Sequence, residues 1–156
     1  MVRFPLPESS TKVQLVRYAA ALVLVLGLSM CGCTSSDEVL RITSPDGRVD
    51  AIVFETNCGA PCSFVYEIWL APRGARHGVE VAFVDAAVRN EKAWGVNLKW
   101  LGTDRLAVEY FRADHSQLMK PSIEVAGDRI EVFLHDGVQD PRAPAGGMEY
   151  NLHKRP

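Results

Sequence analysis

From residue 38 onward, apolar and polar side chains alternate with a period of two, which is typical of half-buried β-strands and not of helices. The pattern is clearest in residues 96–100, 106–110 and 130–134, where β-branched and aromatic residues occupy the apolar positions. Short runs of this kind predict an all-β fold, an antiparallel β-sandwich or partly open barrel of about seven to eight short strands. We expect strands at 39–43, 48–55, 63–71, 79–85, 95–101, 105–111, 122–126 and 129–135.

Turn-forming residues separate these runs. Ser44-Pro45-Asp46-Gly47 suits a tight turn, because proline presets φ and glycine accepts a positive φ. Gly102-Thr103-Asp104 and Gly127-Asp128 each lie between two alternating segments and predict hairpin loops. Residues 72–78 predict a longer loop, and residues 86–94 predict a single helical turn.

The first 32 residues have the features of an export signal. Arg3, Lys12 and Arg17 form a basic start, and an uncharged stretch of about 13 residues follows at 18–30. That stretch is shorter than the roughly 20 residues that a membrane-spanning helix needs. We therefore expect residues 1–32 to be a signal peptide.

The end of this signal resembles the lipobox of bacterial lipoproteins. Cys33 follows the small residue Gly32, whereas Cys31 follows Met30. The resemblance implies that Cys33 receives diacylglycerol and becomes the first residue of a lipid-anchored protein, and an attached lipid holds a protein to a bilayer by burying its acyl chains. Two alternatives remain open: an ordinary cleaved signal with incidental cysteines, and a short uncleaved anchor.

Lipidation would decide where the protein is located. Residues 33–37 would form a short polar tether, and we expect the chain to be exported and anchored to the cell envelope. In a Gram-negative host, Thr34 in place of an aspartate favours the periplasmic face of the outer membrane. Residues 33–156 hold 14 basic and 18 acidic residues, and this acidic balance argues against nucleic-acid binding and against electrostatic docking on anionic lipid.

Residues 56–63 join two predicted strands and contain two cysteines. With Ser44–Gly47 before it and Ser63–Tyr66 after it, the segment resembles an uncharacterised bacterial lipoprotein family with an S-P-D-G … N-x-G-A … S-x-x-Y pattern. The resemblance covers about residues 44–110 and implies a fold and a location, but no chemistry. Pro61 and Cys62 stand where that family often has threonine.

Three roles compete for Cys58 and Cys62. An exported compartment is oxidising, so a disulfide that closes the loop is the favoured interpretation. Thiol chemistry usually needs C-x-x-C at the start of a helix, and the spacing here is C-x-x-x-C between strands. A metal site would need partners from the scattered histidines, and two unpaired thiols are the remaining option. These histidines are His77, His115, His135 and His153.

Motifs of known catalytic families are missing, including G-x-S-x-G, H-E-x-x-H, the P-loop and G-x-G-x-x-G. Asp114-His115-Ser116 is interpreted as a solvated loop, because adjacent residues of an extended chain point to opposite faces. Trp69, Trp94 and Trp100 are interpreted as packing residues, with a ligand surface as the alternative.

These patterns predict a β domain at 38–136 and a Pro/Gly-rich tail at 137–156. The expected function is that of a non-catalytic binding or structural module without a cofactor or metal, held to the membrane by its lipid. Its contact loop for an envelope partner would be Asn57, Gly59, Ala60 and Pro61. The alternatives are a small-ligand or metal-binding lipoprotein that uses the Cys58/Cys62 loop and, less favoured, a thiol-based enzyme.

Overall fold

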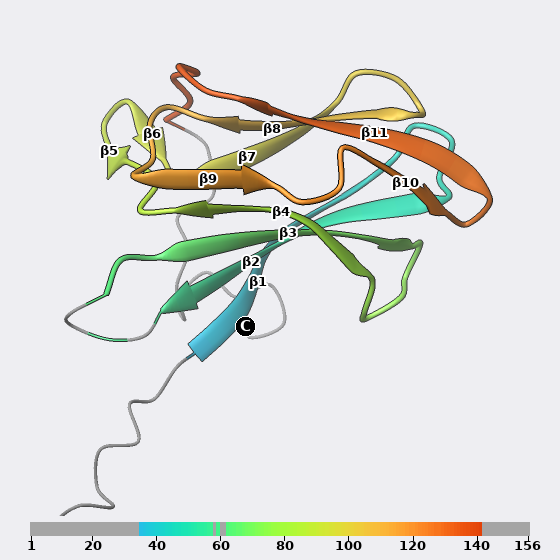
Figure 1. Cartoon of the computed structure of the whole chain (residues 1–156), viewed down its shortest axis with the longest axis horizontal. Coiled ribbons are helices and arrows are strands. Elements are labelled where there is room, and N and C mark those ends of the chain that lie inside the picture. The colour runs from blue at the N-terminus through green and yellow to red at the C-terminus, as the bar shows by residue number, and fades with distance from the viewer. Residues whose placement is uncertain (1–34, 58, 60–61, 142–156) are drawn as a thin grey trace, which may run out of the picture. The chain divides into compact units, whose positions relative to one another are not determined.

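The computed structural model describes residues 35–57, 59 and 62–141, and this part of the chain is all-β, as predicted (Figure 1). Its long strands form two sheets, and a two-stranded hairpin accompanies them. The described residues contain no helix with the length and hydropathy needed to span a membrane. The strands are β1 (Ser35–Thr43), β2 (Val49–Asn57), β3 (Val65–Pro72), β4 (Val79–Asp85), β5 (Arg89–Asn90), β6 (Ala93–Trp94), β7 (Val96–Trp100), β8 (Arg105–Tyr110), β9 (His115–Leu118), β10 (Ser122–Val125) and β11 (Asp128–His135).

The first sheet has five antiparallel strands in the order β1-β2-β3-β4-β9. The predicted turn residues make its first connection, since the Gly47 amide donates to the Ser44 carbonyl at 2.8 Å and Gly47 has a φ of 77°. Residues Ser35 to Thr43 of β1 pair with Asn57 to Asp50 of β2, with one irregularity between Glu38 and Leu40. Short connections between consecutive strands thus build β1 to β4 as a meander.

The second sheet has four strands in the order β10-β11-β8-β7. Both predicted hairpins are present: β7 pairs with β8, and β10 pairs with β11 across Ala126 and Gly127, which have φ values of 53° and 85°. Strands β8 and β11 pair in parallel, so the sheet is mixed and not purely antiparallel. The intervening segment makes this possible, because it crosses to the first sheet as β9 before returning as β10.

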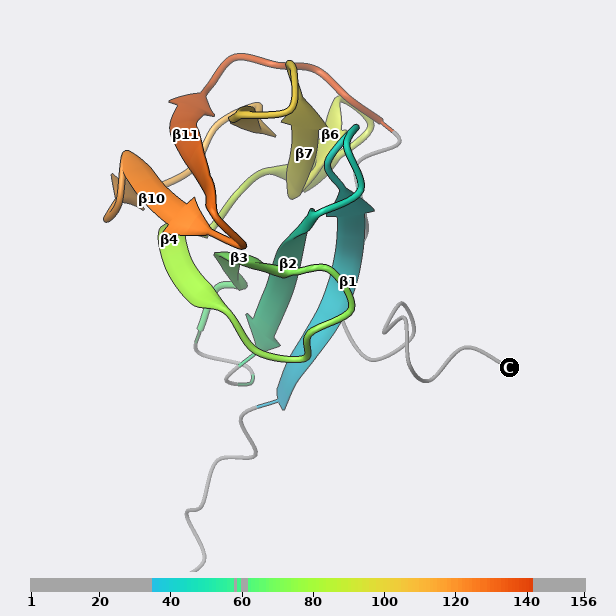
Figure 2. The same ribbon diagram turned by 90° about the vertical axis from the view of Figure 1, so that its right-hand side faces the viewer.

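Buried apolar side chains of both sheets form one core. Tyr66, Ile68 and Leu70 contribute from β3, and Leu106 and Ile130 contribute from the second sheet. Figure 2 shows the two layers from the side, with β1 to β4 in one and β7 and β11 in the other. Each fully buried side chain of this size stabilises the fold by about 1.5–3 kcal/mol, so the sandwich is held chiefly by this cluster.

Two loop predictions are wrong. Residues 86–94 form no helical turn, because β5 and β6 make an extended hairpin whose ends are fixed by the Val88 amide on Arg112 and the Gly95 amide on Val88. The segment Asp114-His115-Ser116 is not a simple loop, since β9 begins at His115 and pairs with β4. In both places hydrogen bonds between distant segments determine the backbone conformation, and such bonds cannot be predicted from the local sequence.

The ends of the domain also differ from the prediction. Residues 35–37, expected in a polar tether, belong to β1, where Ser35 lies opposite Asn57 and Asp37 is buried. At the other end, the predicted tail begins along the second sheet: the Val138 amide donates to Tyr110, and Asp140 accepts from the Asn97 amide at 2.9 Å. The signal peptide, Cys33 and residues 142–156 lie outside the described residues.

Candidate functional site

The outer face of the five-stranded sheet, which faces away from the core, carries the candidate site. Cross-strand pairing places Glu38, Phe54 and Glu67 in one row across β1, β2 and β3. Arg41, Ile52 and Trp69 occupy the next row on the same face. Directly opposed side chains in a sheet lie close enough to interact, so these rows form a continuous patch of aromatic and charged groups.

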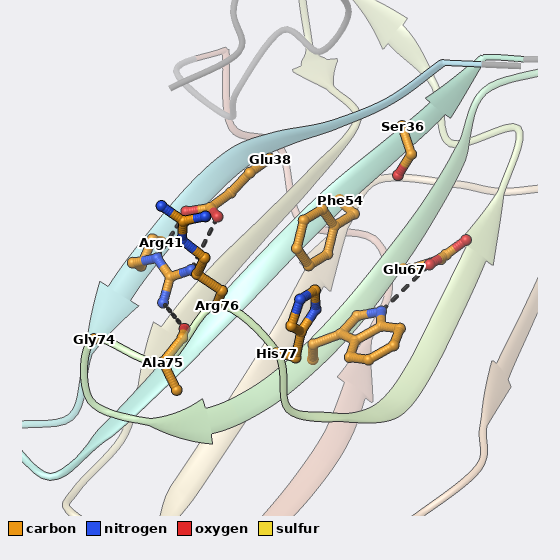
Figure 3. A pocket seen from close by; sticks show the side chains of 10 residues that line it. Ser36, Glu38, Arg41, Phe54, Glu67, Gly74, Ala75, Arg76 and His77 are labelled. Atoms are coloured by element: carbon orange, nitrogen blue, oxygen red, sulfur yellow. Dashed lines mark hydrogen bonds and ion pairs between the residues drawn. The ribbon is translucent and has the colours of Figure 1, made fainter. Parts of the chain in front are cut away.

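The loop between β3 and β4 borders this patch, and together they line an open pocket of about 720 Å³. Pockets of 300–1,000 Å³ are typical of small-molecule sites. Figure 3 shows the lining side chains around one hollow, with His77 on the side of Phe54 and Arg76 on the side of Glu38 and Arg41. The pocket is lined by Ser36, Glu38, Arg41, Phe54, Glu67, Trp69, Gly74, Ala75, Arg76 and His77.

Two aromatic rings form the apolar part of the pocket. The centroids of Phe54 and Trp69 are 5.9 Å apart, and their planes meet at 78°, which is a favourable edge-to-face arrangement. The Trp69 indole nitrogen donates to the Glu67 carboxylate at 3.3 Å, and the Thr56 hydroxyl lies 3.5 Å from the other Glu67 oxygen. These contacts orient the indole, so the rings present a defined surface to a ligand.

Arg41 organises the charged side of the pocket. Its guanidinium donates to both carboxylate oxygens of Glu38, at 2.7 and 2.9 Å, which is the strong bidentate arrangement. A third nitrogen, Nη1, donates to Asp50 at 3.0 Å and to the Ala75 carbonyl at 3.2 Å. Arg41 therefore ties β1 to β2 and to the loop above them.

Asp50 fixes the loop from below. Its Oδ2 accepts the Gly74 amide at 2.8 Å, and its Oδ1 accepts the Thr43 hydroxyl at 2.8 Å. Burial alone raises the pKa of this carboxyl, but the hydrogen bonds from Gly74, Thr43 and Arg41 outweigh it and hold the pKa below its ordinary value. Asp50 is therefore a buried anion whose hydrogen bonds join β2 to β1 and to the loop.

A second fixed point lies at the other end of the loop. A Cβ on Gly78 would collide with the carbonyl of Leu70, so the backbones there approach more closely than any other residue allows. Gly74, at the first fixed point, has a φ of 75°. Arg76 and His77 lie between these two points, and both side chains are exposed. Within the described part of the chain neither makes a hydrogen bond or an ion pair with another side chain, so their donors remain available.

A second polar cluster lies on the inner face of the same strands, between the sheets. Asp37, Glu55 and Tyr66 are opposed across β1, β2 and β3, and all three are buried. Arg89 lies 3.7 Å from the Glu55 carboxylate and stacks on the Phe64 ring at 4.1 Å.

Burial dominates the electrostatics of this inner cluster. It raises the pKa of Glu55, and the neighbouring Tyr66 hydroxyl and the Arg89 charge offset only part of that effect. Burial also raises the pKa of Tyr66, and the Glu55 charge adds to the shift. The cluster is enclosed by the two sheets, so we treat the outer pocket as the candidate site.

The predicted contact loop is only partly described. Cys33, Cys58, Ala60 and Pro61 lie outside the described residues. The Asn57 side chain accepts the Gly59 amide at 2.9 Å, and the Cys62 amide donates to the Gly59 carbonyl at 3.0 Å. Gly59 and Cys62 are exposed, and neither Asn57 nor Gly59, the described residues of the predicted contact loop, lines the pocket.

The histidines of the metal hypothesis lie on different elements. His77 belongs to the pocket loop, His115 starts β9 and lies 5.5 Å from the Phe83 ring, and His135 ends β11 and lies 3.8 Å from Glu109. His153 is outside the described residues. Over residues 35–57, 59 and 62–141, no three His, Cys, Asp or Glu side chains converge as metal ligands.

The three tryptophans differ in their roles. Trp100 packs against the core, and its indole nitrogen reaches the Ile42 carbonyl at 3.4 Å, whereas Trp94 is exposed on the short hairpin. Trp69 lines the pocket, so for this residue the ligand-surface alternative fits better than simple packing. The roles of Arg41 and Asp50 were not predicted from the sequence, although a charged residue in the middle of an apolar strand is a usable signal.

Comparisons of the chain with protein-family models, with curated proteins and with solved structures find no match. The candidate site therefore stands on its geometry alone.

Proposed function

We propose that this protein is a lipid-anchored module of the cell envelope that binds a small ligand on its outer sheet face and performs no catalysis. The observation that carries the binding function is the pocket between the β3–β4 loop and the sheet, whose loop is held by the Arg41–Asp50 pair and whose floor is aromatic. The pocket replaces the Cys58/Cys62 loop as the proposed ligand site.

The anchor rests on the amino-terminal sequence. Its basic start, its short apolar stretch and the Gly32-Cys33 junction match a lipoprotein signal. A lipid on Cys33 would supply membrane attachment that the acidic body cannot supply by charge. In this proposal the β domain is exported and stays on the membrane surface, where it faces ligands of the envelope.

Labelling with a palmitate analogue in intact cells, followed by membrane fractionation, tests the anchor. Cys33→Ser should abolish labelling and release the mature protein from the membrane fraction. Cys31→Ser is the matched control and should leave both unchanged. Labelling that persists in Cys33→Ser and disappears in Cys31→Ser would refute the assignment.

A preformed pocket is the reason to expect ligand binding and not a purely structural role. Arg41 donates one hydrogen bond to the Ala75 carbonyl and Asp50 accepts one from the Gly74 amide, so both strands hold the loop in place without a ligand. Preorganisation of this kind lowers the entropy that binding must cost. Mass spectrometry of small molecules retained by the full-length protein tests this, with Trp69→Leu as the comparison, since ligands of the pocket should be lost from the variant.

The Asn57–Cys62 segment remains our proposed contact surface for an envelope protein. In support, Gly59 and Cys62 are exposed, and the turn at Asn57 gives the segment a defined start. We also propose a disulfide between Cys58 and Cys62, because the compartment that an exported protein enters is oxidising. Crosslinking in intact cells, with residues 57–62 replaced in the comparison strain, should remove a single reproducible partner. A partner that is retained would refute the surface.

A further inference from the structure

The balance of used and unused polar groups in the pocket indicates the charge of its ligand. Each oxygen of the Glu38 carboxylate accepts a hydrogen bond from Arg41, so the charge of Glu38 is paired. The Glu67 carboxylate accepts the Trp69 indole N–H. Ser36 adds a hydroxyl that can donate or accept. Arg76 and His77 are donors without a side-chain acceptor in the described part of the chain.

The loop backbone makes these two donors a fixed feature of the site. The Gly74 amide is held by Asp50 and the Ala75 carbonyl by Arg41, two residues and one residue before Arg76. Gly78, directly after His77, is confined against the Leu70 carbonyl. Arg76 and His77 thus extend from a short backbone segment that is anchored on both sides.

Arginine is suited to one kind of partner in particular. Its planar guanidinium matches the two oxygens of a carboxylate or a phosphate, and such charge-assisted bonds are about twice as strong as neutral ones. Beside the two donors, the Phe54–Trp69 pair offers an apolar surface. Its single polar group, the Trp69 indole N–H, already donates to Glu67.

We propose that the pocket binds a small organic anion: a carboxylate or phosphate held by Arg76 and His77, attached to a flat apolar body that lies against Phe54 and Trp69. This inference rests on the proposed binding function and specifies its ligand class. The volume of about 720 Å³ accommodates a body of two fused rings together with its anionic head.

The test titrates the full-length protein, purified in a nonionic detergent, with four probes. These are 2-naphthylacetate, 2-naphthyl phosphate, 2-naphthylacetamide and 2-(2-naphthyl)ethylamine. The readout is the NMR signal of the Trp69 indole N–H, assigned by its loss in Trp69→Phe. We expect the two anions to bind with dissociation constants on the order of 1 mM, as suits fragments of this size, and the amide and the amine to bind at least tenfold more weakly.

Arg76→Gln and Arg73→Gln form the matched pair of variants. Arg73 lies in the same loop but is not among the lining residues, and its Nη1 donates to the Gly47 carbonyl at 3.4 Å. Arg76→Gln should weaken anion binding roughly tenfold and leave amide binding unchanged, since only the charge-assisted bond is lost. Arg73→Gln should change neither, which also corrects for partitioning of the probes into detergent.

The outcomes separate the ligand class from the binding function. Tighter binding of the amine or the amide than of both anions overturns the anion assignment but leaves a binding pocket. Equal weakening of all four probes in Arg76→Gln would also overturn it, because a general disturbance of the loop would then explain the effect. If no probe moves the Trp69 signal, both the anion assignment and the proposed binding function fail.

Discussion

Asp50 and Glu55 are buried carboxylates of the same strand, yet their surroundings shift their pKa values in opposite directions. Asp50 faces outward, accepts three hydrogen bonds from Gly74, Thr43 and Arg41, and has a lowered pKa. Glu55 faces inward, and neither of its oxygens accepts a well-formed hydrogen bond from a described residue. Its pKa is raised by burial, which the charge of Arg89 at 3.7 Å and the Tyr66 hydroxyl only partly offset.

The difference shows that the hydrogen-bond donors around a buried carboxylate, and not its burial, decide whether it stabilises the fold. Both side chains are almost fully shielded from water, so the desolvation cost is present in both. On the outer face, the hydrogen bonds to Asp50 offset its desolvation cost and also position the pocket loop. On the inner face the interactions of Glu55 offset only part of its desolvation cost, so we expect Glu55 to contribute little to the stability of the sandwich.

The largest effect is expected from Asp50→Asn. The amide group would turn an N–H₂ toward donors that now point at a carboxylate, and the Arg41 charge would lose one partner. We expect a loss of about 3 kcal/mol in the free energy of unfolding, measured by chemical denaturation. Asp136→Asn, at an exposed position, is the control and should cost less than about 0.5 kcal/mol. A loss as small as that of the control would show that the outer network is dispensable.

Gly95→Ala should disturb the inner cluster next. Gly95 has a φ of 92°, and a Cβ there would collide with the hydroxyl and ring of the fully buried Tyr66. We expect a loss of about 2 kcal/mol, from left-handed strain together with displacement of the tyrosine. Gly137→Ala separates the two causes, because Gly137 has a φ of 76° with nothing within 4 Å of the added Cβ. Equal losses in the two variants would assign the whole effect to backbone strain.

Glu55→Gln should have a small effect at neutral pH, under about 1 kcal/mol in either direction. The substitution keeps the shape of the side chain, removes a desolvated charge and also removes the attraction to Arg89, so opposing contributions nearly cancel. Parallel denaturation of Glu55→Gln and Asp50→Asn makes the comparison direct. A loss for Glu55→Gln as large as for Asp50→Asn would contradict our account of the inner cluster.

The smallest effect is a change in how stability depends on pH. Because the folded-state pKa of Asp50 is lowered, its contribution is present above the ordinary value of 3.8 and is lost as the pH falls through the folded-state pKa. Because the folded-state pKa of Glu55 is raised, the folded state binds this proton more tightly. The contribution of Glu55 to stability is therefore fully present below the ordinary value of 4.5 and is lost as the pH rises through the raised folded-state pKa.

Unfolding free energies measured across acidic pH resolve the two contributions. Asp50→Asn should flatten the loss of stability at the acid end, and Glu55→Gln should remove the decline above pH 4.5. If Glu55→Gln instead removes the loss at the acid end, the assignment of the two carboxylates is reversed.

The sequence predicted the strands far better than their partners. All eight expected strands are present, because alternation and turn residues are local signals. Strand β8 pairs in parallel with β11, and β9 crosses to the first sheet. Both arrangements depend on hydrogen bonds between distant segments, so no local pattern predicted them. The pocket was missed for the same reason, since Arg41, Asp50 and Gly74 come together only through pairing and loop closure.

The start of β1 at Ser35 has a mechanical consequence. If Cys33 carries the lipid, as we propose, only Thr34 separates the acylated residue from a strand that is already paired with β2. Two residues span at most about 7 Å, so the linker is very short and the domain must stay close to the leaflet that holds its acyl chains. Its effective search volume is then a thin layer above the bilayer, and whatever it binds must come to that layer.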